Sequence, residues 1–446
     1  MILITKIRFN NNINFLVFLS LINLIRLIFI LILVAPFSLF NKEKAIYFFF
    51  NFAGPSFIKL GQLLSVRADL VGKEVALILA KFQDSIPPFS QKKVTDILHK
   101  EFGDDFNKIF KEFNLSPVAS ASIAQVHKAK LNNDVNVAVK ILRPNIHKTM
   151  MRDISTLRLL NKICYFFSKF LAKTFKDIGD LLDQTAKYEL DLLHEGANGS
   201  RLRDDMSGAK GFYVPQIFWQ HSSTKILVIE WIDGIAFSNS QAIAQSPFDK
   251  KILAENLVLS YFSQVYVHGF FHADMHPGNL FLKDNGDIAV VDFGIMGKID
   301  KKTRIAVAEV LIGFLHRDYE KVAKIHVDVG FVPKETNIDD LALSCRKIGE
   351  MIVGVDVKDI SIAKLLTALI DLSRNYKMET KPELLLLQKT LLLVEGVGVS
   401  LDPDLNIWDL ARPWVKEWAK TNIGFDAKIR DNILEILQLV KNFFNK

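Results

Sequence analysis

Two neighbouring motifs constrain the fold of this chain more than any other feature. The first, His272-Ala-Asp-Met-His-Pro-Gly-Asn279, places an asparagine five residues after an aspartate, and the second is Asp292-Phe-Gly294. Together they supply a carboxylate, an amide and a second carboxylate around one turn and one apolar run. These groups suit the binding of Mg²⁺ and a nucleoside triphosphate. The pattern therefore predicts a fold for ATP-dependent phosphoryl transfer.

The protein-kinase template predicts a role for each of these residues. In kinases the catalytic-loop aspartate orients or deprotonates the attacking hydroxyl, while the asparagine and the Asp-Phe-Gly aspartate hold the metal ions. The matching residues are Asp274, Asn279 and Asp292. We therefore predict Asp274 as a catalytic residue, and Asn279 and Asp292 as Mg²⁺ ligands. His276 has two interpretations, a residue that supports the site or an ordinary loop histidine.

A strand-like segment upstream carries a candidate phosphate-binding lysine. Residues 135–141 alternate in polarity as a strand does, and Val137-Ala-Val-Lys140 lies within them. In kinases the lysine of such a strand contacts the α- and β-phosphates and pairs with a helix glutamate. Glu195 and Glu189 are both candidates for that partner, and the sequence does not choose between them. The ordinary alternative, a solvent-facing edge lysine, is disfavoured by the downstream motifs.

A run of small residues precedes this strand, where a kinase has its glycine-rich phosphate loop. Alanine and serine leave little bulk near a phosphate, but they adopt positive φ less readily than glycine. We therefore expect a stiffer loop that contacts the nucleotide, with an ordinary small-residue turn as the alternative. The run consists of Val118, Ala119, Ser120, Ala121, Ser122, Ile123, Ala124, Gln125 and Val126.

Composition excludes several other classes of protein. The net charge of +7 is mild and the basic residues are scattered, so we expect no nucleic-acid partner. The charge suits an anionic membrane surface or a phosphate ligand. Cys164 and Cys345 are the only cysteines and form no CxxC or Cys/His cluster, which argues against zinc and redox sites.

The N-terminal segment predicts contact with a membrane. Residues 13–40 are almost wholly apolar, interrupted by Asn14, Ser20, Asn23 and Arg26. The uninterrupted part is short for a span of about 20 residues. Three interpretations remain open: a transmembrane helix, an interfacial helix, and a helix docked on the protein.

The rest of the chain predicts helices around two groups of strands. Strands are expected at 135–141, 225–231 and 288–292. Helices are expected at 45–64 with a break at Gly54-Pro55, and in five further segments before the second motif. Those five are 71–83, 91–102, 106–113, 146–175 and 178–203. After Gly294 we expect almost only helix, starting near residue 303. No Ala-Pro-Glu motif and no long activation segment follow, which argues against docking of a peptide substrate.

Several motifs together resemble the UbiB family of atypical kinase-like proteins. Lys59-Leu-Gly-Gln62 is similar to its KxGQ signature, Ala119 to Gln125 to its alanine-rich loop, and Glu189-Leu-Asp191 to its ExD motif. The runs at 387–398 and 410–414 also resemble bacterial members. The resemblance covers about residues 45 to 420, and no ordinary kinase carries KxGQ.

The resemblance implies an activity and a location. It implies that Lys59, as a further catalytic residue, and Gln62 face the nucleotide pocket near Glu189 and Asp191, and that the KxGQ segment covers the space of a peptide substrate. It implies ATP and Mg²⁺ as cofactors and a role in ubiquinone biosynthesis. The expected partners are membrane lipids or quinone intermediates and other enzymes of that biosynthesis, at the cytoplasmic face of a bacterial inner membrane.

We therefore predict an α+β, kinase-like bilobal fold that is predominantly helical and has an N-terminal helical extension. The predicted segments are 1–44 at the membrane, 45–115 carrying KxGQ, 116–235 as the N-lobe and 236–446 as the helical C-lobe. Two other functions stay open. One is a small-molecule phosphotransferase, against which KxGQ and the alanine-rich loop argue. The other is a nucleotide-binding pseudokinase scaffold.

Overall fold

The chain forms two compact units in the computed structural model. One unit contains residues 1–198 and 216–231, and the other contains residues 199–215 and 232–446. The residues described are 2–38, 40–65, 68–79, 86–353, 365–369, 372, 376, 382–407, 409–411, 413–414 and 418. The run at 410–414 is therefore only partly described.

The first unit is built around an antiparallel sheet that places Lys140 on a central strand. The strand order is β1-β3-β4-β6, with β2 paired to β3. Lys140 on β4 lies opposite Val126 on β3 and Leu227 on β6. The strands are β1 (Phe110–Phe113), β2 (Ala119–Ser120), β3 (Ala124–Leu131), β4 (Asn136–Leu142) and β6 (Ile226–Glu230).

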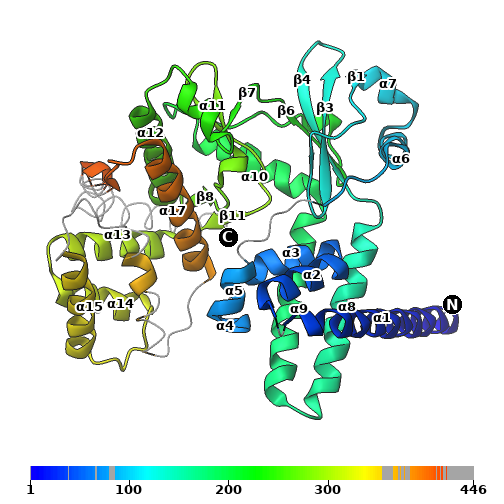
Figure 1. Cartoon of the computed structure of the whole chain (residues 1–446), viewed down its shortest axis with the longest axis horizontal. Helices are drawn as coiled ribbons and strands as arrows, with labels where there is room; N and C mark the ends of the chain where they lie inside the picture. Colours follow the sequence, from blue (N-terminus) through cyan, green and yellow to red (C-terminus); the bar gives the residue numbers. More distant parts are fainter. Residues whose placement is uncertain are drawn as a thin grey trace, which may run out of the picture. The chain divides into compact units, whose positions relative to one another are not determined.

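Helices make up the rest of the first unit (Figure 1). They are α1 (Ile2–Ser38), α2 (Lys42–Ala53), α3 (Pro55–Ser65), α4 (Ala68–Val71), α5 (Lys73–Leu79), α6 (Gln91–Phe102), α7 (Phe106–Ile109), α8 (Ile146–Tyr165), α9 (Lys169–Glu189) and α10 (Leu192–Asp205). The predicted break at Gly54-Pro55 is confirmed between α2 and α3. The last residues of α10 belong to the second unit.

Two predictions of helix extent were wrong. The helix predicted at 106–113 ends at Ile109, because Phe110 turns into the buried edge of the sheet and pairs with Leu131. The break predicted near residue 176 does not exist, because α9 runs through it. The chain instead breaks where N-terminal capping residues start new helices. Ser168 caps α9 by accepting a hydrogen bond from Leu171 N–H, and Asp191 caps α10 by accepting one from Leu193 N–H.

One stripe of α1 is docked on the protein. Its buried residues are Ser20, Asn23, Leu27, Ile30 and Val34, spaced three and four apart along one helix face. Asn23 Nδ2 donates to Asp153 Oδ1 and Thr156 Oγ1 on α8, both at 2.9 Å. Two of the polar residues that interrupt the apolar run, Ser20 and Asn23, thus belong to the docked stripe.

Over residues 18–38, the other faces of α1 are mostly apolar and exposed. Phe18–Ser38 is long and apolar enough to cross a membrane, with a mean hydropathy of 2.7, and Pro382–Leu401 also qualifies at 1.7. Core helices of soluble proteins and signal sequences can have the same length and hydropathy, so these two helices give only weak support for a membrane location. Residues such as Phe29 and Ile32 are more than half exposed.

The second unit contains two small sheets that carry both chemical motifs. One has the order β5-β10-β9-β7 and the other pairs β8 with β11. The strands are β5 (Phe212–Tyr213), β7 (Gly234–Ala236), β8 (Phe270–His272), β9 (Leu280–Lys283), β10 (Ile288–Val290) and β11 (Met296–Lys298). The helices are α11 (Ser240–Gln245), α12 (Lys250–Phe262), α13 (Lys301–Leu315), α14 (Tyr319–Val329), α15 (Ile338–Val353) and α17 (Pro382–Leu401).

Strand β11 was not predicted from the sequence. It pairs with β8, with Gly297 opposite Phe271. A Cβ at Gly297 would lie 2.1 Å from Cζ of Phe271, so only glycine allows this close approach. The residues after Asp-Phe-Gly therefore return along β8 before α13 begins.

Candidate active site

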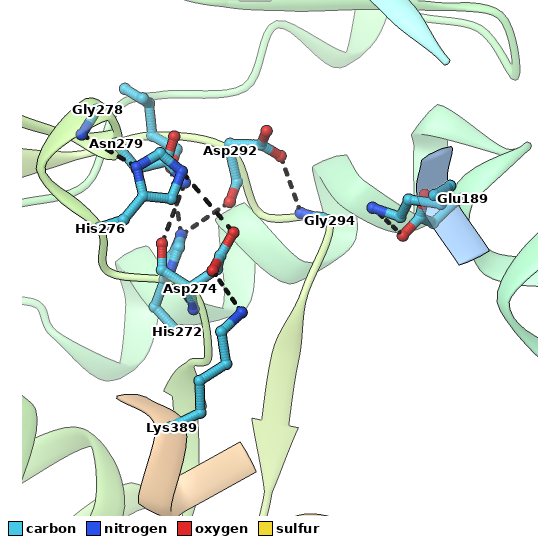
Figure 2. A network of polar contacts seen from close by, with 11 residues as sticks. Glu189, His272, Asp274, His276, Gly278, Asn279, Asp292, Gly294 and Lys389 are labelled. Atoms are coloured by element: carbon cyan, nitrogen blue, oxygen red, sulfur yellow. Dashed lines mark hydrogen bonds and ion pairs between the residues drawn. The ribbon is translucent and has the colours of Figure 1, made fainter. Parts of the chain in front are cut away.

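The two motifs meet because β9 begins beside the end of its antiparallel neighbour β10 in the second unit. Strand β8 ends at His272 and leads into the loop that carries Asp274, and a 3₁₀ turn at Pro277–Asn279 leads into β9. Strand β10 pairs with β9 and ends two residues before Asp292. Figure 2 shows the polar contacts that join these segments.

His272 connects the two motifs by hydrogen bonds through both ring nitrogens. Asp274 N–H donates to Nδ1 at 3.2 Å, so the proton of the neutral ring lies on Nε2, which donates to Asp292 O at 2.7 Å. The ring is fully buried and packs edge-on against Phe293. Burial lowers the pKa of His272, which favours the neutral form that these bonds require.

Asp292 has an unusual backbone conformation. Its φ of 66° lies in the left-handed region, which non-glycine residues rarely adopt. Aspartate tolerates this region because its side chain bonds locally, here by accepting Gly294 N–H at 3.3 Å. The side chain of Asp292 is exposed, and its carbonyl is the one bound by His272. Strain of this kind is typical of functional sites.

Asn279 and Asp292 offer a donor set that fits Mg²⁺. Asn279 Nδ2 donates to Asp274 O at 3.1 Å, which leaves the amide oxygen as the ligand atom. Mg²⁺ in phosphoryl-transfer sites takes one or two protein oxygens and fills its other positions with phosphate and water. One amide oxygen and one exposed carboxylate match this requirement. Among the described residues no cluster of three or more His, Cys, Asp or Glu side chains forms a metal cage.

Lys389 is a site residue that we did not predict. It lies on α17, and its Nζ is 2.8 Å from Asp274 Oδ1. His276 approaches the other oxygen, with Nε2 3.8 Å from Oδ2, and its Nδ1 accepts Gly278 N–H. The sequence signal for Lys389 is weak: one basic residue in a helix that is otherwise mostly apolar.

Two largely buried ion pairs place the candidate residues of the first unit. Lys140 Nζ lies 2.7 Å from Glu195 Oε1, and Lys59 Nζ lies 2.6 Å from Glu189 Oε1. Glu195 is therefore a partner of Lys140, whereas Glu189 pairs with Lys59. Both glutamates flank the corner between α9 and α10, which Asp191 caps. Figure 2 includes the contact of Glu189. Gln62 lies one turn after Lys59 on α3 and is partly buried.

An arginine holds the alanine-rich loop. Ala121 N–H donates to Ala124 O at 2.8 Å, which closes a tight turn between β2 and β3. Arg143 donates to Ala121 O through Nε at 3.0 Å and to Ser120 Oγ through Nη2 at 2.9 Å. All nine loop residues are described, and none of them has a positive φ. These bonds agree with a stiff loop.

The predicted nucleotide-binding residues of this loop differ in their accessibility. Val118 and Ala119 are exposed, and Ser120, Ala121 and Val126 are partly exposed. Four others are buried: Ser122, Ile123, Ala124 and Gln125. The Gln125 side chain accepts Phe89 N–H and lies 2.8 Å from His127 Nε2, so its amide supports the sheet. Any contact of Gln125 with a nucleotide therefore comes from its backbone.

Comparison with known proteins identifies the family. Residues 81–326 match the ABC1 atypical kinase-like domain, and residues 345–406 match the UbiB helical domain. The chain is 39% identical over 373 residues to "Probable protein kinase UbiB" of Pseudomonas putida, which covers 82% of this chain and 69% of that protein. The chain belongs to the UbiB family. The protein of the same name from Pseudomonas fluorescens is 37% identical and covers 86% of this chain and 73% of that protein.

A solved structure supports the kinase-like fold of this UbiB-family chain. The complex of Rv3197 with erythromycin from Mycobacterium tuberculosis superposes with a TM-score of 0.54 at 22% identity, covering 78% of this chain and 89% of that one. The predicted fold, kinase-like and mostly helical with small sheets, is confirmed. Lys389 lies within the stretch that matches the UbiB helical domain.

The neutral state of His272 predicts a pH-dependent stability. Because its pKa is lowered in the folded chain, the unfolded chain binds the proton more tightly, so stability is lost as the pH falls below about 6.5. His127 and His326 have lowered pKa values for the same reason, burial. We expect a lower thermal unfolding midpoint at pH 5.5 than at pH 7.5. His272→Gln should reduce this difference and His147→Gln, at an exposed position, should not. An unchanged pH dependence in His272→Gln contradicts the assignment.

The Lys59–Glu189 pair predicts strong energetic coupling. Removing one partner leaves a buried charge uncompensated, at a cost of about 3–5 kcal/mol. Lys59→Met and Glu189→Leu should therefore each lower the unfolding midpoint strongly. The double variant should be more stable than the sum of the two effects by at least about 1 kcal/mol.

The exposed pair Lys42–Glu74 is the matched control. Its coupling should stay below about 1 kcal/mol, because both side chains are in water. Simple additivity at Lys59 and Glu189 would show that the buried pair contributes no specific interaction.

Proposed function

We propose that the chain is an ATP- and Mg²⁺-dependent atypical kinase or ATPase that supports ubiquinone biosynthesis at a membrane. The observation that carries the proposal is the bonding of both chemical motifs to His272, which holds Asp274, Asn279 and Asp292 in one network. Relatives that are 37% to 39% identical carry the name "Probable protein kinase UbiB", which supports the same assignment.

Each residue has a proposed role in phosphoryl transfer. Lys140, oriented by Glu195, contacts the α- and β-phosphates, and the stiff loop around Ala121 lies against them through its backbone. Asn279 and Asp292 hold Mg²⁺, which neutralises charge on the transferred phosphoryl group. Asp274 orients a water molecule or an acceptor hydroxyl. Lys59 and Gln62, both on the KxGQ helix α3, are proposed to regulate access of an acceptor to the bound nucleotide.

The structure after Asp-Phe-Gly supports an acceptor other than a peptide. Residues 295–300 contain β11, which pairs with β8, and α13 begins at Lys301. These residues leave no segment that a peptide substrate could dock on as in protein kinases. Water, a lipid or a quinone intermediate is the proposed acceptor, at the cytoplasmic face of a bacterial inner membrane. The exposed apolar faces of α1 support this location.

Asp292→Asn should weaken the binding of Mg²⁺ and thereby lower ATP turnover. The amide keeps the shape of the side chain but loses the charge that binds the ion, so ATP turnover should fall by about 100-fold or more. Turnover is measured by phosphate release and Mg-ATP affinity by calorimetry. Asp284→Asn, in the exposed turn between β9 and β10, serves as the control. Turnover equal to that of the parent would exclude Asp292 as a metal ligand.

The position of Lys389 beside Asp274 predicts that its replacement slows the chemical step without weakening the binding of Mg-ATP. Its ammonium lies at the carboxylate that faces the acceptor, so we expect it to bind charge that develops on the transferred phosphoryl group. Lys389→Met should lower kcat by about 10- to 100-fold with little change in KM for Mg-ATP, and Lys389→Arg should recover part of it. Lys321→Met on α14 is the control. An increase in KM alone would assign Lys389 to substrate binding.

A further inference from the structure

The tip of the hairpin formed by α8 and α9 exposes an aromatic cluster. Tyr165, Phe166, Phe167 and Phe170 have exposed fractions of 63%, 83%, 86% and 77%. Single exposed aromatic residues are common on soluble proteins, but a contiguous group at the end of a projecting element marks an interaction site. Figure 1 shows the two helices projecting as a pair from the rest of the first unit.

The aromatic cluster has no role in packing the hairpin. Helices α8 and α9 pack through residues nearer their base, including Ile154, Leu157 and Leu182. All of residues 163–171 are described, and none of them belongs to that apolar core. Folding of the hairpin therefore does not explain why phenylalanines occupy its tip.

The tip is held in a defined conformation. Phe167 N–H and Ser168 N–H both donate to Cys164 O, at 2.9 and 2.7 Å. Below them Asn161 Nδ2 donates to Ala172 O at 2.7 Å, which joins the two helices. The phenylalanines are thus presented on a short, hydrogen-bonded turn, and little ordering is needed when they bind.

The charge around the tip indicates the chemistry of its partner. Residues 154–176 contain five basic residues and no acidic residue. All five are exposed: Arg158, Lys162, Lys169, Lys173 and Lys176. Arg158 and Lys176 form ion pairs with Asp183 and Asp180, so the positive charge of the tip comes mainly from the three other lysines. Aromatic residues with flanking lysines are typical of segments that enter the interface of an anionic bilayer, where the ammonium groups reach the lipid phosphates.

A second apolar surface is fixed to the same hairpin. Helix α1, whose exposed faces are apolar, is bonded to α8 at Asp153 and Thr156. At a rise of about 1.5 Å per residue, Tyr165 lies about 14 Å farther along α8 than Thr156. The hairpin tip is therefore close enough to α1 for both to reach one membrane.

We propose that the α8–α9 tip is a membrane-docking site that inserts Phe166, Phe167 and Phe170 into the interface of an anionic phospholipid bilayer. Lys162, Lys169 and Lys173 contact the lipid phosphates around it. The docking site is separate from the residues of phosphoryl transfer, so failure of this proposal would leave the proposed phosphoryl transfer untouched.

A depth measurement on the full chain tests this site directly. A nitroxide label is attached at Phe167→Cys in a Cys164→Ser background, since the other cysteine, Cys345, is fully buried. The protein is reconstituted into vesicles of 70% phosphatidylcholine and 30% phosphatidylglycerol. The label should become more accessible to oxygen and less accessible to a water-soluble nickel chelate than the same label at Asn133→Cys, in the exposed turn after β3.

A series of variants measures how much the tip itself contributes to membrane binding while α1 is left unchanged. The combination Phe166→Ser, Phe167→Ser and Phe170→Ser should weaken vesicle binding about tenfold or more. Lys162→Gln, Lys169→Gln and Lys173→Gln together should remove the preference for phosphatidylglycerol. A label at Phe170→Cys is a second reporter if the first variant does not fold. Labels at both positions that stay as accessible to nickel as the Asn133 label would overturn the proposal, as would immobilisation of the label only by added membrane proteins.

Discussion

The hydrogen bonding of the buried His272 imidazole is the interaction on which the rest of the candidate active site depends. Nδ1 accepts a hydrogen bond from the backbone N–H of Asp274, and Nε2 donates one to the carbonyl of Asp292. A single planar group thus sets the relation between the two acids, whose loops would otherwise move separately. The bond to the carbonyl also helps to hold the left-handed backbone of Asp292. Only a neutral ring can make both bonds, and burial, which lowers the pKa of His272, favours that form.

In the first unit, two largely buried ion pairs play the part that the hydrogen bonds of His272 play in the second unit. Lys59 and Lys140 come from a helix and a strand that are distant in sequence, and their partners flank one corner between α9 and α10. Buried ion pairs contribute little net stability, but removing one partner leaves a buried charge without compensation and is strongly destabilising. The KxGQ helix and the lysine strand are therefore anchored to the same piece of backbone, whose position Asp191 fixes as a helix cap.

The sequence predicted the parts of this molecule that depend on local pattern. The catalytic loop, the lysine strand and the break at Gly54-Pro55 all follow from spacing or from proline and glycine. The choice between Glu189 and Glu195 did not, because it depends on which helix turn faces β4. Lys389 was missed because its partner is 115 residues away and its own helix is mostly apolar. The end of α9 was missed because helix length was judged by apolar period and the capping residues were not weighed.

The polar residues of α1 have a consequence for how the helix can turn. Asn23 donates to one oxygen of the buried Asp153 carboxylate and to the buried Thr156 hydroxyl on α8, and Ser20 is buried on the same stripe. Rotating α1 about its axis would place an isoleucine or leucine against Asp153 and carry the amide of Asn23 into the surrounding medium. Both changes are costly, because a buried polar group without a partner is penalised. The helix therefore has one preferred rotation about its own axis. As a result, the apolar faces that it presents outward are fixed with respect to the rest of the first unit.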